Sequence, residues 1–142
     1  MTDGPLVIDA SVVVEYLTDA GLAEPARSVF ESAVAGDAEL WAPELILVEA
    51  VSALRKMVLR RGITAAQGRV AALRVPQLPV FTTAMRDMIP RLWQLRDRMT
   101  PYDATYSALA IRLEAPLVSS DTRLVKAHRS ARGKAVLLAE FR

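Results

Sequence analysis

Residues 6–11 read LVIDAS, an apolar run that ends in an aspartate, and this stretch decides the fold class. The uncharged run 6–8, rich in β-branched residues, predicts a strand buried on both faces, as in a parallel sheet. Residues 117–124, LVSSDTRL, repeat the arrangement and lead to Asp121. Ligands of parallel α/β sheets bind beyond the carboxyl ends of the strands, so we expect Asp9 and Asp121 at one edge of one sheet.

Helical and extended segments alternate along the rest of the chain, which predicts an α/β three-layer sandwich with a mostly parallel central sheet flanked by helices. The expected helices span residues 12–17, 24–36, 43–60, 64–74, 83–99, 100–113 and 122–131, and the further strands 40–42, 75–80 (at an edge) and 135–139. Ser11 is expected to cap the first helix, Pro43 to open the third and Pro90 to kink or split the fifth. Without a repeat or a long linker, residues 1–142 are expected to form a single domain.

The composition excludes several classes of site. The chain has no cysteine, so disulfides, thiolate zinc sites and cysteine nucleophiles are ruled out. The first residues lack the basic and apolar regions of a secretory signal, and the apolar stretch 45–59 is interrupted by Glu49, Arg55 and Lys56. We therefore expect a cytoplasmic protein.

The charges are distributed unevenly along the chain. Residues 1–50 hold ten acidic side chains and one basic one, whereas residues 51–142 hold seventeen basic and six acidic ones. This asymmetry indicates a polyanion-binding surface near an acidic site, although scattered solvated arginines would give the same count.

Two further carboxylates stand out by their surroundings. Glu49 lies in the apolar segment LILVEAV (residues 45–51), where a charge is costly unless it reaches water or a partner. Asp103 lies in the first turn of the helix that begins near Thr100. Each acid also has a purely structural explanation, because Asp9 and Asp121 can cap helices, Thr100 and Asp103 can form a capping box, and Glu49 can face a gap in the packing.

The combination of motifs resembles a PIN domain, and in particular a VapC-type toxin of a type II toxin–antitoxin pair. The resemblance extends over residues 6–141, and it rests on four segments that stand in the order of that family: LVIDAS (6–11), PELILVEA (43–50), TPYDATYSALA (100–110) and LVSSDTRL (117–124). The Tyr-Asp-Ala step within the third segment is the most specific of these motifs.

The resemblance implies a PIN-like sandwich and a metal-dependent endoribonuclease. Its acidic pocket would be formed by Asp9, Glu49, Asp103 and Asp121, with the Ser11 and Ser119 hydroxyls beside it. We expect Asp9, Asp103 and Asp121 to bind Mg²⁺ or Mn²⁺, since hard cations prefer carboxylates, and Glu49 to position water or act as a base. The implied partners are an RNA substrate, a VapB-type antitoxin and a second copy of the chain.

One departure concerns the last motif. Some relatives carry further acids close to the last aspartate, whereas Thr122 and Arg123 follow Asp121 here. This leaves open whether the pocket takes one metal ion or two.

Other chemistries are limited by what the chain lacks. His128 is the only histidine and lies in a basic segment, which favours a surface position and excludes a two-histidine ribonuclease. Ser11 and Ser107 are expected to have no histidine partner for nucleophilic catalysis, and no phosphate-binding glycine loop is present. Two alternatives remain: a flavodoxin-like phosphoacceptor module that uses Asp9 or Asp121, and a non-catalytic RNA-binding domain.

Overall fold

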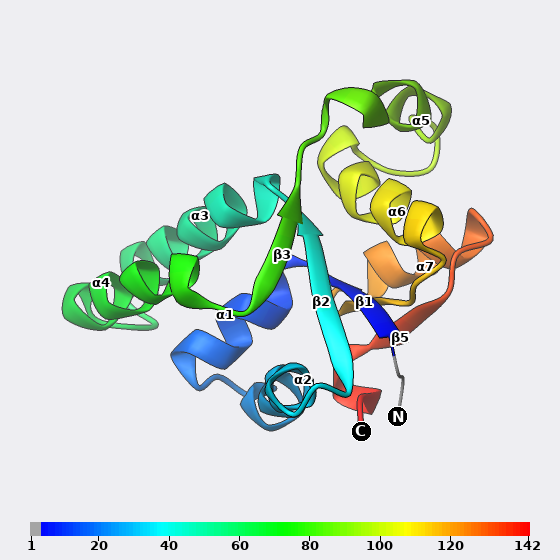
Figure 1. Ribbon diagram of the computed structural model, residues 1–142. Coiled ribbons are helices and arrows are strands. Elements are labelled where there is room, and N and C mark those ends of the chain that lie inside the picture. Colours follow the sequence, from blue (N-terminus) through cyan, green and yellow to red (C-terminus); the bar gives the residue numbers. More distant parts are fainter. Residues whose placement is uncertain (1–3) are drawn as a thin grey trace.

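The computed structural model describes residues 4–142, which form a five-stranded sheet between helices (Figure 1). All neighbouring strands within this range are parallel, in the order β3-β2-β1-β4-β5, so the predicted α/β sandwich is confirmed. The strands are β1 (Gly4–Ile8), β2 (Ala38–Pro43), β3 (Val80–Thr83), β4 (Leu117–Ser119) and β5 (Ala135–Leu137). Residues 1–3, on which the prediction of no secretory signal partly rests, lie outside the described residues.

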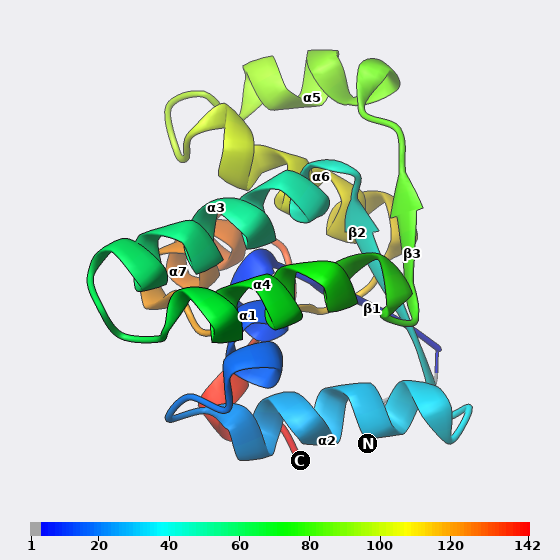
Figure 2. The same cartoon turned by 90° about the vertical axis from the view of Figure 1, so that its left-hand side faces the viewer.

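The helices lie on both faces of the sheet. They are α1 (Ala10–Thr18), α2 (Ala23–Val34), α3 (Leu45–Leu59), α4 (Ala65–Arg74), α5 (Ile89–Gln94), α6 (Pro101–Leu113) and α7 (Thr122–Ser130). Helices α1, α3 and α4 pack together on one face, and α6 and α7 pack on the other, with α5 against α6 (Figures 1 and 2). Among residues 4–142, no helix is long and apolar enough to span a lipid bilayer.

The strand order creates a switch point between β1 and β4. The chain steps from β1 to β2 and β3 in one direction, and from β4 to β5 in the other. The crevice beyond the carboxyl ends of the strands at such a point is where open parallel sheets bind their ligands. The order also differs from the 2-1-3-4-5 order of flavodoxin-like modules. Asp9 and Asp121, which follow β1 and β4, therefore lie on either side of the switch point.

The two central strands are held rigidly by apolar packing. Val7, Ile8, Leu117 and Val118 are completely buried, as expected for a parallel strand covered on both faces. At the edge of the sheet, by contrast, Phe81 on β3 is 54% exposed. The switch point thus lies in the buried interior of the sheet.

Two predictions about helix boundaries were wrong. Asp9, not Ser11, caps α1, because its carboxylate accepts the Ser11 N–H at 3.1 Å. Pro43 is the last residue of β2, and α3 begins two residues later. The stretch expected to be kinked or split at Pro90 is split there: a 3₁₀ turn spans Arg86–Met88, and Pro90 stands in the first turn of α5, where a fixed φ and a missing N–H cost nothing.

The segments before α5 also differ from the prediction. Residues 75–77 form a 3₁₀ turn, and β3 begins only at Val80, although it does lie at the edge of the sheet. The final strand is shorter than expected and passes into a 3₁₀ turn over Leu138–Glu140.

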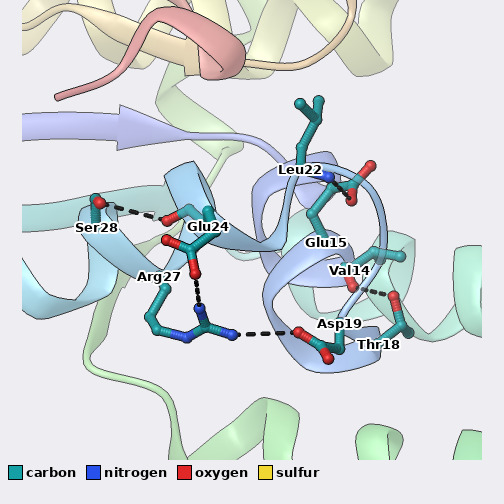
Figure 3. A network of polar contacts seen from close by, with 8 residues as sticks. All are labelled: Val14, Glu15, Thr18, Asp19, Leu22, Glu24, Arg27 and Ser28. Carbon is teal, nitrogen blue, oxygen red and sulfur yellow. Dashed lines mark hydrogen bonds and ion pairs between the residues drawn. The ribbon is translucent and has the colours of Figure 1, made fainter.

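The turn from α1 to α2 accounts for part of the acidic charge in the first fifty residues (Figure 3). Arg27 forms ion pairs with Asp19 at 3.2 Å and with Glu24 at 2.9 Å, and Glu15 accepts the Leu22 N–H at 3.0 Å. Exposed pairs of this kind contribute little to stability. These three acids thus belong to a surface turn and not to the crevice at the switch point.

Candidate active site

Asp9 lies where β1 ends, and both of its oxygens are engaged by hydroxyl groups. Ser11 donates to Asp9 Oδ1 through its Oγ at 2.5 Å and through its backbone N–H. Ser119, the last residue of β4, donates its Oγ–H to Asp9 Oδ2 at 2.6 Å. The two serines therefore fix the rotamer of a carboxylate that is only 7% exposed.

The same serines join the ends of the two central strands. Ser11 Oγ accepts the Ser120 N–H at 3.0 Å, and Ser119 Oγ accepts the Asp121 N–H at 2.9 Å. Each hydroxyl thus donates to Asp9 and accepts from the loop after β4. This network sets the position of Asp121 relative to Asp9 across the switch point.

Burial changes the protonation of Asp9. Loss of hydration raises the pKa of this carboxyl from 3.8 to about 6, although the hydrogen bonds from Ser11 and Ser119 oppose the change. A buried carboxylate with a raised pKa gains from a nearby positive charge. Asp9 is therefore suited to a cation.

Asp121 caps α7 and still keeps part of its carboxylate available. Its Oδ1 accepts the N–H groups of Arg123 and Leu124 at 2.9 and 3.3 Å. No hydrogen bond of residues 4–142 uses its Oδ2. Capping and a functional role are thus compatible for Asp121.

Asp103 lies at the start of α6, close enough to Asp121 to be affected by its charge. Burial raises the pKa of Asp103, the charge of Asp121 raises it further, and Arg123 lowers it. Thr100 Oγ1 accepts the Asp103 N–H at 3.2 Å, but within the described residues the Asp103 carboxylate does not complete a capping box. By contrast, Thr64 and Gln67 form a complete capping box at the start of α4, in which the Gln67 side chain accepts the Thr64 backbone N–H. The carboxylate of Asp103 is therefore not used by its own helix.

Glu49 reaches the same region from α3, where it is held by Tyr106 of α6. The Tyr106 hydroxyl donates to Glu49 Oε1 at 2.5 Å. Burial raises the pKa of Tyr106 strongly, followed by the effects of Glu49, Asp9 and Asp103, so the phenol stays protonated. Tyr106 thus lies among three of the four predicted acids.

Tyr106 had no predicted role. The sequence nevertheless indicates that Tyr106 lies near Asp103, because it follows Asp103 by three residues and so shares a helix face with it. A buried phenol that donates to a carboxylate orients that carboxylate and leaves its second oxygen, Glu49 Oε2, for another partner.

The acids approach one another without forming a closed metal cage. In the described part of the chain, no group of three or more His, Cys, Asp or Glu side chains is arranged to hold a metal ion. The donor set is still that of a hard cation, since it consists of oxygens, and burial raises the pKa of both Asp9 and Asp103, with the charge of Asp121 raising that of Asp103 further. The residues fit Mg²⁺ or Mn²⁺ by donor chemistry.

The predicted surface position of His128 was wrong. The side chains of His128 and Ser107 are completely buried, and Ser107 Oγ lies 2.7 Å from His128 Nδ1. Burial lowers the pKa of His128, which keeps the imidazole neutral. A substrate cannot reach a pair with no exposed surface, so we interpret it as a hydrogen bond that joins α6 to α7 and not as a nucleophile with its base.

The sequence of this chain matches one protein family over most of its length. The PIN domain family model matches residues 6–129. The chain is 36% identical over 126 residues to "Ribonuclease VapC1" of Mycobacterium tuberculosis, covering 85% of this chain and 89% of that protein. It is 33% identical over 123 residues to "Ribonuclease VapC12" of the same species, covering 87% and 92%.

Solved structures share the fold at low sequence identity. VapBC2 from Rickettsia felis, crystallised with a DNA fragment from its promoter, aligns with a TM-score of 0.68 at 13% identity, covering 94% of this chain and 98% of that one. FitAcB from Neisseria gonorrhoeae aligns with a TM-score of 0.66 at 13% identity, covering 96% and 99%.

Proposed function

The chain belongs to the PIN-domain family, and we propose that it is a VapC-type endoribonuclease, the toxin of a toxin–antitoxin pair, which hydrolyses RNA phosphodiester bonds at the switch point. The curated relatives are named as VapC ribonucleases and match most of the chain. One observation carries the proposal: Asp9 and Asp121 follow adjacent central strands and share the Ser119 hydroxyl. A flavodoxin-like phosphoacceptor is not favoured, because the strand order differs.

The four carboxylates divide the work of hydrolysis. Asp9, Asp103 and Asp121 would hold Mg²⁺ or Mn²⁺. When bound, such an ion would orient water, lower its pKa and neutralise charge on the phosphate. Ser11 and Ser119 keep the Asp9 oxygens in one orientation. Tyr106 holds Glu49 Oε1, so that Glu49 Oε2 can accept a proton from the attacking water.

We further propose an antitoxin partner and a homodimer in the cytoplasm. The solved structures VapBC2 and FitAcB, which share the fold, are complexes of two different proteins by their names, and this supports the antitoxin partner. Trp93 on α5 is 68% exposed and so is available for contact with another chain. Light scattering of the purified protein would measure the mass of the particle.

The function can be tested by mapping RNA ends. We expect induced expression to arrest growth and to create new RNA ends at a small number of sites, and co-expression of the antitoxin to prevent both effects. Purified protein should produce the same ends with Mg²⁺ or Mn²⁺ and should stop when EDTA is added. If RNA is bound but never cut under any of these conditions, the non-catalytic alternative is correct.

Metal binding should stabilise the protein in a pH-dependent way. Because the pKa of Asp9 is raised to about 6, its contribution to stability is fully present below about pH 4 and is lost as the pH rises through about 6. A cation compensates the charge that then forms. We expect Mn²⁺ in about 100-fold excess over its Kd to raise Tm by about 5–10 °C at pH 7.5, and hardly at pH 5.

Thermal denaturation with Mn²⁺ and with EDTA, carried out at pH 7.5 and at pH 5, measures the increase of Tm at each pH. Asp9→Asn should abolish most of the increase at pH 7.5, because the amide carries no charge. An equal increase of Tm at the two pH values would mean that the cation binds elsewhere.

A further inference from the structure

Arg123 brings a positive charge to the acidic crevice. It is the second residue of α7, and its backbone N–H donates to Asp121 Oδ1 at 2.9 Å, so its backbone position is fixed by one of the predicted metal ligands. Its side chain is exposed. The side chain is also close enough to Asp103 for its charge to lower the pKa of that carboxyl, against the larger effects of burial and of Asp121.

Within the described residues, the guanidinium of Arg123 nevertheless forms no ion pair. Over residues 4–142, ion pairs are formed by Arg27 and Arg112, and none involves Arg123. The N–H donors of Arg123 therefore remain free to bind a ligand next to the carboxylates. A guanidinium presents a planar fork that matches two oxygens of a phosphate.

Arg123 does not stabilise α7 at the position where it stands. A cation in the first turn of a helix opposes the helix dipole, which favours acids at that end. The other bases of α7, Lys126 and Arg129, lie further along the helix. The charge of Asp103 offsets part of this cost, because the two side chains are close enough for their charges to interact.

We propose that Arg123 binds the non-bridging oxygens of the scissile RNA phosphate and stabilises the negative charge that grows on them during hydrolysis. This inference rests on the proposed function. The four predicted carboxylates would repel an anionic substrate, and Arg123 would offset part of this repulsion on the side of Asp103. Arg123 forms no covalent bond and transfers no proton. Its contribution is electrostatic, of the kind that a preorganised donor supplies at a developing charge.

Kinetics of three substitutions test the proposal. With saturating Mn²⁺, we expect Arg123→Ala to lower kcat about 100-fold and Arg123→Lys, which keeps the charge but loses the fork, about tenfold. Arg123→Glu should be at least as impaired as Arg123→Ala. The matched control is Arg129→Ala, which removes the same charge from the same helix and should leave kcat within about twofold.

Two further measurements distinguish contact with the phosphate from an indirect effect. Guanidinium added at millimolar concentration should restore part of the activity of Arg123→Ala, while equal sodium chloride should not. RNA binding, measured in the Asp9→Asn background where no cleavage occurs, should lose about 0.7 from its salt slope on Arg123→Ala, as expected for one lost contact with single-stranded RNA.

The outcomes separate this proposal from the one on which it rests. If the wild-type protein cleaves RNA and Arg123→Ala cleaves it equally fast, the role of Arg123 is refuted and the nuclease stands. The role is also refuted if a higher pH alone restores Arg123→Ala, because Arg123 would then act only on the pKa of Asp103. If the wild-type protein cleaves no RNA, it is the proposed function that fails.

Discussion

Replacing Asp9 by asparagine is expected to reduce RNA cleavage by at least about 1,000-fold, while the protein remains folded. The substitution keeps the size and the hydrogen-bonding oxygen of the side chain but removes its charge. Ser11 N–H and Oγ–H can still donate to the amide oxygen, and Ser119 Oγ can accept from the amide nitrogen. The effect should therefore fall on catalysis, measured with a labelled RNA and a fixed concentration of Mn²⁺.

Asp19→Asn is a matched control for this experiment. Asp19 lies at the opposite end of the same helix, where its backbone is left-handed with a φ of 54°, a conformation that asparagine also tolerates. This substitution removes the same charge and one exposed ion pair with Arg27. It should leave the rate of cleavage unchanged. Full activity of Asp9→Asn would show that the metal and the chemistry lie outside the switch point.

The positions of Asp9 and Asp121 could be predicted because they depend on local sequence alone. An apolar run followed by an acid predicts the end of a buried strand, and the rule for parallel sheets then places both ends at one edge. Asp103 and Glu49 required the family resemblance, because a helical position by itself does not say which way a carboxylate points. Their distances from one another depend on how α3 and α6 pack, which no local pattern contains.

His128 shows why the remaining errors arose. The basic residues around it suggested a surface position, yet it follows Leu124 by four residues and Val125 by three, which places it on the apolar face of α7. Its partner, Ser107, lies 21 residues away on α6. The helical period was the better guide, but the pairing itself arises only when the two helices pack.

The burial of His128 leads to a prediction about Gly133, which packs against the imidazole. We expect Gly133→Ala to destabilise the protein by about 3 kcal/mol, measured by urea denaturation. A Cβ at this position would overlap the Cε1, Nε2 and Cδ2 atoms of His128. The ring cannot move aside easily, because it is completely buried and is held by Ser107 at Nδ1. The Gly133 N–H also donates to the His128 carbonyl at 2.9 Å, which keeps the two residues together.

Gly21→Ala is the control, since a Cβ at Gly21 would meet nothing within 4 Å and should change stability by less than about 0.5 kcal/mol. A double-mutant cycle identifies the cause of the effect at Gly133. His128→Ala removes the ring and leaves Ser107 without a partner, so it should itself be destabilising. In that background the additional cost of Gly133→Ala should fall below about 1 kcal/mol, because the added methyl group would occupy the space of the ring. If the two costs simply add, the clash with the imidazole is not what limits this position, and the requirement for glycine would lie in the backbone of the turn between α7 and β5.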